Sequence, residues 1–168
     1  MADPTVSAFT FAGYLLAKSV SILAGAPCEE LLVPIALVER SNHPEFLVFE
    51  AETQEKAVER GLSAMKEVEA TAAAWAFAHE GYARSGEQRT DAFFVRLWAK
   101  GSAEPLMLVQ SWKKQATTCQ SATLTRIGKV QLLVDGKMID LTDEQQAALE
   151  QGIGTNPEVA SAWKASVP

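Results

Sequence analysis

The sequence predicts an α+β fold: a mostly antiparallel sheet of five to six strands, packed with an N-terminal helix, a middle helix and C-terminal helices. A continuous apolar stripe at helical spacing runs through the first 23 residues, and residues 72–113 alternate like three consecutive strands. The connections after residue 81 are too short for parallel crossovers. With 168 residues, the chain is long enough for one domain, which we expect to span residues 1–168.

The N-terminal helix is predicted from apolar residues that recur every three or four positions. They are Val6, Phe9, Gly13, Leu16, Val20 and Leu23. Lys18 is the only charge between residues 5 and 26, and small residues follow Leu23 as at a signal-peptide cleavage site. However, no basic residue precedes the apolar run, and a charge in its middle opposes a membrane span. We therefore expect the buried helix of a cytoplasmic protein.

The next two strands form a predicted hairpin. Residues Leu31–Glu39 alternate as a strand, in which Pro34 indicates an edge position, and Phe46–Ala51 return after a polar turn. Thr53 suits the N-cap of a helix that extends to about Glu69.

Residues 72–82 are the third expected strand, and Asp91–Lys100 and Pro105–Lys113 follow as a hairpin. Both faces of this hairpin carry large apolar side chains, so something should cover each side. The residues that we place at the second covered face, as a candidate interface, are Phe94, Arg96, Trp98, Met107 and Val109.

Short strands and helices are predicted in the C-terminal third of the chain. Residues 117–127 alternate weakly as a strand, and the Asp-Gly pair within Gln131–Ile139 favours a tight hairpin turn. Thr142 and Gln145 fit a capping box at the start of a helix, which Gly152-Ile153-Gly154 is expected to stop.

A last short helix is predicted to open at Asn156-Pro157, because proline is favourable in the first helical turn. Trp163 is its expected anchor in the core.

The charge argues against nucleic acid as the main partner, since the net charge of -6 opposes phosphate binding. Residues 81–130 nevertheless hold eight bases and three acids, so this basic block is a candidate anion surface. Phe94, Arg96 and Trp98 within it resemble a stacking platform for bases, although a covered sheet face explains them more simply.

The cysteines and histidines predict no metal site and no cofactor. Cys28 and Cys119 form no CxxC motif and have no histidine at ligand spacing, so a reduced pair is favoured over a disulfide. His43 precedes a proline in a turn, where an exposed side chain without a function is expected.

A catalytic alternative rests on His79, Glu80 and Asp91, because a carboxylate beside a histidine is the minimum for general acid/base chemistry. The simpler interpretation is a loop closed by ion pairs that use Arg84 or Arg89 with these acids. Adjacent strand residues point to opposite faces, so His79 and Glu80 should be separated unless the strand bulges.

The stretch from Trp75 through Gly81-Tyr82 to Arg89-Thr90-Asp91-Ala92 resembles segments of uncharacterised bacterial proteins, and this resemblance implies no activity. The leading functional hypothesis is a non-catalytic binding or adaptor module that self-associates as a homodimer, through the second sheet face or the N-terminal helix. Its other partner would be an unidentified protein or small molecule. A small hydrolase or transferase is the second hypothesis, and a nucleic-acid or anion binder is the third.

Overall fold

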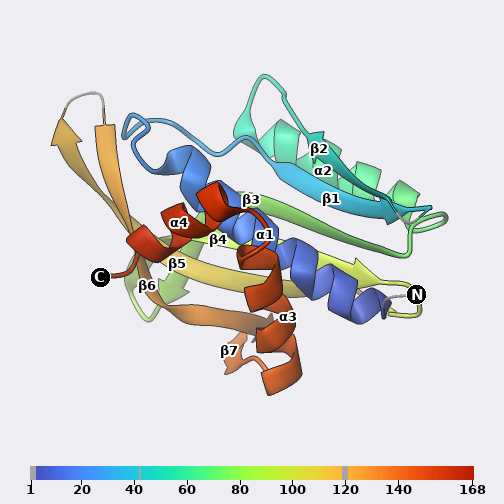
Figure 1. The fold of residues 1–168 in the computed structure, drawn as a ribbon. Coiled ribbons are helices and arrows are strands. Elements are labelled where there is room, and N and C mark those ends of the chain that lie inside the picture. Colours follow the sequence, from blue (N-terminus) through green and yellow to red (C-terminus); the bar gives the residue numbers. More distant parts are fainter. Residues whose placement is uncertain (1–2, 42, 119–120) are drawn as a thin grey trace.

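A computed structural model describes residues 3–41, 43–118 and 121–168 of the chain. Cys119 and part of the strand predicted for residues 117–127 lie outside this description. The elements, in chain order, are α1 (Pro4–Leu23), β1 (Ile35–Arg40), β2 (His43–Val48), α2 (Gln54–Val68), β3 (Ala74–Ser85), β4 (Gln88–Ala99), β5 (Leu106–Thr118), β6 (Ser121–Val134), β7 (Lys137–Asp140), α3 (Asp143–Ile153) and α4 (Pro157–Ala165). The predicted α+β class is confirmed (Figure 1).

The described strands form one antiparallel sheet in the order β2-β1-β3-β4-β5-β6-β7. The predicted count of five to six strands was therefore too low, since the described residues form seven. The hairpin predicted within Gln131–Ile139 corresponds to the end of β6 and to β7, an edge strand of four residues that are all exposed. Such edge strands are held by backbone pairing and leave a weak burial pattern in the sequence.

The edge position predicted from Pro34 was wrong. Pro34 lies just before β1, and its carbonyl oxygen accepts a hydrogen bond from the Phe49 amide at 2.9 Å. Because β1 pairs with both β2 and β3, the edge strand is β2, which contains Pro44. A proline tolerates an edge because no neighbour needs its missing N–H group.

The β3–β4 hairpin extends beyond the strands predicted at residues 72–82 and 91–100, and the β6–β7 hairpin has the turn that its sequence predicts. β3 and β4 pair without interruption from Ala74 opposite Ala99 to Ser85 opposite Gln88. β6 and β7 are joined through Asp135 and Gly136, whose φ angles of 50° and 76° are typical of the predicted Asp-Gly turn.

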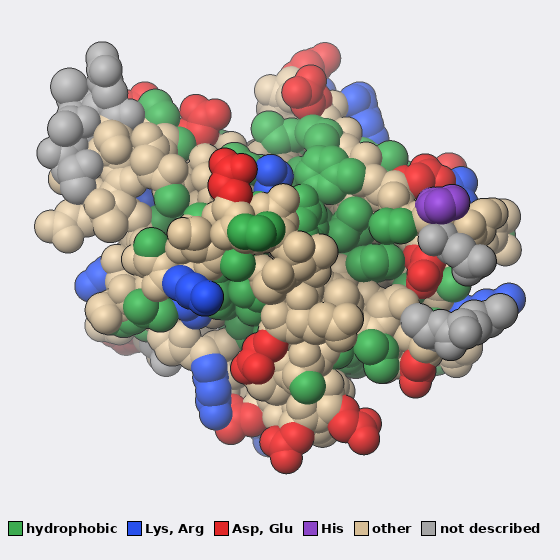
Figure 2. Space-filling view, viewed as in Figure 1, with side chains coloured by type: hydrophobic (Ala, Val, Ile, Leu, Met, Phe, Trp, Pro, Cys, Tyr) green, Lys and Arg blue, Asp and Glu red, His purple; other side chains and the backbone are tan. Residues whose placement is uncertain are grey.

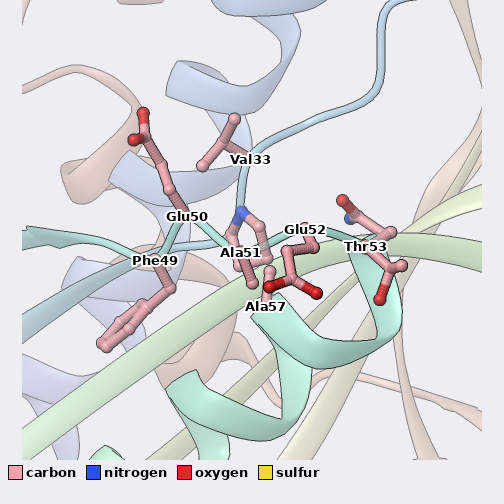
Figure 3. Close-up of a pocket in the computed structure, with 9 residues that line it drawn as sticks. Val33, Phe49, Glu50, Ala51, Glu52, Thr53 and Ala57 are labelled. Carbon is pink, nitrogen blue, oxygen red and sulfur yellow. The ribbon is translucent and has the colours of Figure 1, made fainter.

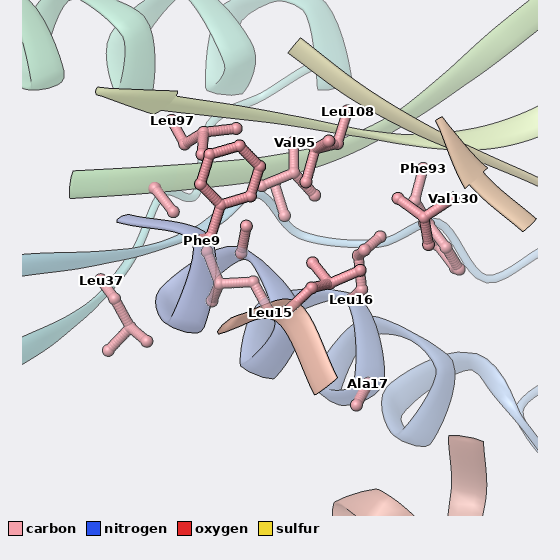
Figure 4. Packing of buried hydrophobic residues seen from close by; sticks show 14 of the residues in the cluster. Phe9, Leu15, Leu16, Ala17, Leu37, Phe93, Val95, Leu97, Leu108 and Val130 are labelled. Carbon is pink, nitrogen blue, oxygen red and sulfur yellow. The ribbon is translucent and has the colours of Figure 1, made fainter. Parts of the chain in front are cut away.

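α1 lies in the middle of the molecule, between the sheet and the two C-terminal helices (Figure 1). Phe9, Leu15 and Leu16 are at most 1% exposed and point toward Val95, Leu97 and Leu108 of the sheet (Figure 4). By length and composition α1 is also apolar enough to cross a membrane, and 61% of its most apolar window is buried inside the fold. A helix covered on both sides needs apolar residues around most of its circumference.

α1 and α3 approach each other closely at two glycines. A Cβ atom on Gly13 would overlap the carbonyl oxygen of Leu149, and one on Gly152 would overlap that of Thr10. The helix stop predicted at Gly152-Ile153-Gly154 is confirmed, and Gly152, inside the last turn of α3, is in addition a contact position. The helix ends at Gly154, whose N–H group bonds to the Glu150 carbonyl oxygen.

α2 packs on the other face of the sheet, mainly against β1 and β3. Thr53 caps it as predicted and accepts a hydrogen bond from the Lys56 amide. The buried residues of this second core are Ala36, Val38, Met65, Ala72, Trp75, Phe77 and Trp98.

The C-terminal helices are held by caps and by one arginine. Thr142 and Gln145 form the predicted capping box of α3, and Asn156 caps α4. Trp163 is 9% exposed, and the Arg126 guanidinium lies 3.8 Å from its ring centroid. Arg126 also donates to the Ser166 hydroxyl at 2.7 Å, which fastens α4 to β6.

Candidate functional site

His79 is packed between aromatic rings on the α2 side of the sheet. Its ring centroid lies 5.8 Å from that of Phe77 and 5.7 Å from that of Phe94, with the latter two rings only 15° from parallel. Nδ1 donates to the carbonyl oxygen of Glu80 at 3.0 Å, because a carbonyl can only accept. Nε2 is buried and makes no hydrogen bond among the described residues. This environment suits a neutral, structural imidazole.

Glu80 lies on the opposite face, where it fastens the segment after α1. Its Oε1 accepts a hydrogen bond from the Leu32 amide at 2.5 Å. Lys114 holds the same segment by donating to the backbone oxygens of Cys28 at 3.3 Å and Glu30 at 2.8 Å. Burial raises the pKa of Glu80, as does the nearby charge of Asp91, while the Leu32 amide and Lys114 oppose that rise.

The sheet therefore separates the residues of the catalytic alternative. Asp91 is opposite Tyr82, two positions from Glu80 on the same face, whereas His79 is opposite Phe94 on the other face. The described residues of this stretch of the β3–β4 ladder form no β-bulge. Among the described residues, no carboxylate is hydrogen-bonded to the imidazole for an exchange of protons.

The arginines of the predicted loop cluster do not close a salt bridge. Arg84 lies directly opposite Arg89 near the β3–β4 turn, and among the described residues neither forms an ion pair. Arg89 instead stacks on Tyr82, with its guanidinium carbon 3.4 Å from the ring centroid. The cluster is an exposed hairpin end with an unpaired positive charge.

Titration of His79 should make the protein less stable in mild acid. Burial lowers its pKa below the ordinary 6.5, and the charge of Arg96 lowers it further, against the opposing effect of the Glu80 carbonyl. Between the lowered pKa and 6.5 the unfolded chain binds more protons, so the free energy of unfolding rises with pH there and levels off above 6.5.

Urea unfolding of the protein and of His79→Gln at several pH values measures this effect as the difference between their profiles. The comparison with a variant is needed because the titration of Glu80 changes the free energy of unfolding in the opposite direction. Its pKa is raised above 4.5, so its contribution to stability falls as pH rises through the window above 4.5. Parallel profiles for the protein and His79→Gln would contradict the assignment to His79.

The candidate interface residues all lie on the second face of β4 and β5, but they differ in burial. Trp98 is 8% exposed inside the α2 core, and its Nε1 donates to the Ser102 carbonyl oxygen at 3.1 Å. Phe94, Arg96 and Met107 are half-buried, and Val109 is buried between them. Arg96 forms no ion pair with any described residue, and its Nε is buried without a hydrogen bond. Of these residues, only Trp98 belongs to the buried cluster against which α2 packs.

A cleft of about 340 Å³ opens where β2 leads into α2 (Figure 3). Glu50 and Glu52 supply its charges, but their side chains point apart, and Glu52 pairs with Lys56 at 2.9 Å. Across the residues with assigned positions, no group of three His, Cys, Asp or Glu side chains is placed to hold a metal ion.

A second cleft, of about 230 Å³, lies between α1 and the β1–β2 hairpin and is lined largely by Phe11, Tyr14, Leu37 and Phe46. The sequence prediction missed this surface, because Pro34 suggested the wrong edge strand. The proline in His43-Pro44-Glu45-Phe46 was the available signal for the true edge.

Comparisons with models of known protein families, with characterised proteins and with solved structures find no match to this chain. The function must therefore be inferred from its own surfaces.

Proposed function

We propose that this protein is a non-catalytic binding module that self-associates as a homodimer. The supporting observation is a part of one sheet face over which none of the described helices packs. We call it the open sheet face and define it by Phe94, Arg96, Met107 and Val109. α2 packs against β1 and β3, while α1, α3 and α4 lie on the other side of the sheet. A sheet face with aromatic and aliphatic side chains is stabilised when a second surface covers it.

A second copy suits this face for geometric reasons. Two sheets pack about 10 Å apart with their side chains interdigitated, and a two-fold axis places the same face on both sides. Arg96, opposite Met107, brings to this face a guanidinium that pairs with no carboxylate of the described residues. The dimer must supply an acceptor for it, since a charge buried without a partner is costly.

The alternatives have weaker support. The hydrolase or transferase has its imidazole and its carboxylates on opposite faces of the sheet. The anion or nucleic-acid binder rests on Arg84 and Arg89, an exposed pair at one hairpin end in a chain of net charge -6.

Met107→Glu should convert the dimer to a monomer while leaving the fold intact. Met107 is half-buried on the open sheet face, so a carboxylate there remains hydrated in the monomer and loses its hydration in the dimer. We expect light scattering at micromolar concentration to give twice 18.1 kDa for the protein and 18.1 kDa for the variant.

Leu106→Glu is the matched control, because Leu106 is the neighbouring residue on the other face and is 40% exposed. It should leave the mass unchanged. A mass of one chain for the unmodified protein would contradict the proposed function, and equal effects of both substitutions would move the interface away from the open sheet face.

A further inference from the structure

The edge strand β2 carries exposed apolar side chains on the α1 side of the sheet. Phe46 is 43% exposed and Val48 is 50% exposed, with the exposed Pro44 beside them. Figure 2 shows hydrophobic side chains gathered where the β1–β2 hairpin meets α1. We call Pro44, Phe46 and Val48 the β2 edge patch. It is far from the open sheet face in the strand order, because β1 and β3 lie between β2 and β4.

Backbone groups of this strand are also free to pair. The Phe49 amide donates to Pro34, so it points toward β1. Inward and outward groups alternate along an antiparallel strand, so the N–H and C=O groups of Phe46 and Val48 point away from the sheet. An unpaired edge of this kind is a template for an added strand.

The cleft beside the patch can receive side chains. Its volume of about 230 Å³ lies against Phe11 and Tyr14 of α1 and Phe46 of β2. Strand residues alternate between faces, so every second side chain of an added strand would lie on the cleft side. Apolar side chains there would cover the β2 edge patch.

The ends of the patch are acidic. On the same face, Glu39 lies opposite Pro44, and Glu50 follows Val48 by two positions. Neither carboxylate forms an ion pair with a described residue. The stretch of residues 29–60 holds eight glutamates and three Lys or Arg residues. Arg40 and Lys56 pair with glutamates, and Arg60 donates to the backbone oxygen of Glu50 at 2.6 Å.

We propose that the free edge of β2 binds an extended segment of a partner protein, apolar at alternate positions and carrying Lys or Arg at both ends. Main-chain hydrogen bonds to Phe46 and Val48 would pair the segment with β2. Its alternating apolar side chains would enter the cleft and determine which segments bind. The basic ends meet Glu39 and Glu50. A second copy fits less well, because its own β2 brings acidic ends to an acidic rim.

The probe is a fluorescein-labelled peptide, Lys-Lys-Val-Thr-Val-Thr-Val-Lys-Lys, capped at both ends. Its binding to the full-length protein is followed by fluorescence anisotropy. We expect saturable binding that weakens with added salt, since salt screens exposed charges. Phe46→Asp should weaken binding by at least about 10-fold. Amide exchange should slow at Phe46 and Val48 in the complex.

Ile139→Asp is the matched control, because Ile139 lies on β7, the opposite edge of the sheet, and is 44% exposed. It should leave the affinity unchanged, as should Met107→Glu, which tests the proposed dimer separately. Circular dichroism verifies that each variant is folded.

Three results would overturn the proposal. One is the absence of saturable binding up to about 1 mM peptide, the limit of weak specific affinity. Another is equal binding of a peptide with Glu in place of every Lys, and the third is equal weakening by Ile139→Asp. A dimer that Phe46→Asp dissociates and Met107→Glu does not would instead identify a second copy as the occupant.

Discussion

Gly152→Ala is expected to lower the free energy of unfolding by about 3 kcal/mol, at the upper end of overpacking effects. The new methyl group would overlap the Thr10 carbonyl oxygen and crowd the Tyr14 amide nitrogen. Both atoms belong to the backbone of α1, so neither can rotate away, and the two helices must separate. α1 also packs against β3 and β4, so this displacement is transmitted to the main core.

Thermal unfolding followed by circular dichroism measures this loss. A chain of this size should melt about 6 to 12 °C lower. Gly154→Ala is the matched control two residues along the chain: its Cβ would lie 3.5 Å from the nearest atom, in ordinary contact. Gly13→Ala should lower the stability as Gly152→Ala does. The double variant should lose less free energy of unfolding than the sum of the two single losses, because the first substitution already separates the helices. Equal melting temperatures for Gly152→Ala and Gly154→Ala would contradict this expectation and show that α1 and α3 can separate at little cost in stability.

Local chemistry explains why some elements could be predicted from the sequence. Thr53, Thr142 and Asn156 cap their helices through side chains a few residues from the groups that they satisfy. The Asp135-Gly136 turn is equally local, since its positive φ angles suit these two residues. Each signal and its effect lie within a few positions of each other along the chain.

Contacts between distant residues could not be predicted in this way. Gly152 resembles a helix stop in sequence, and only its contact with Thr10 shows its packing role. The wrong edge strand has the same origin, because β1 becomes internal through pairing with β3, almost forty residues later.

The candidate site shows the same division. Alternation along β3 and β4 was enough to separate His79 from Glu80. It also placed Phe94, Trp98 and Met107 on one face, but it carried no information about how far α2 extends across that face. Because α2 reaches Trp98 and not Met107, residues with the same sequence signal differ in burial.

Trp98→Glu is therefore expected to unfold the protein partly or wholly, with a loss of at least about 3 to 5 kcal/mol, since a buried charge without a partner adds to the cost of the lost aromatic packing. Trp98 belongs to a core that includes Trp75 of β3 and Met65 of α2, and its Nε1 hydrogen bond to Ser102 would also be lost. Thermal unfolding should show a melting temperature more than about 6 °C lower at every protein concentration.

Trp98→Phe is the control that keeps the aromatic packing without the charge or the Nε1 hydrogen bond, and it should cost about 1 to 2 kcal/mol. If Trp98 were an interface residue, Trp98→Glu would give a stable monomer that melts like Met107→Glu, and this outcome would contradict its place in the core. The contrast between two residues on one sheet face measures where α2 ends: a charge at Trp98 should disturb folding, and a charge at Met107 should disturb only association. If both charges changed only the mass, α2 would not cover Trp98 in solution, and the open sheet face would extend across β4.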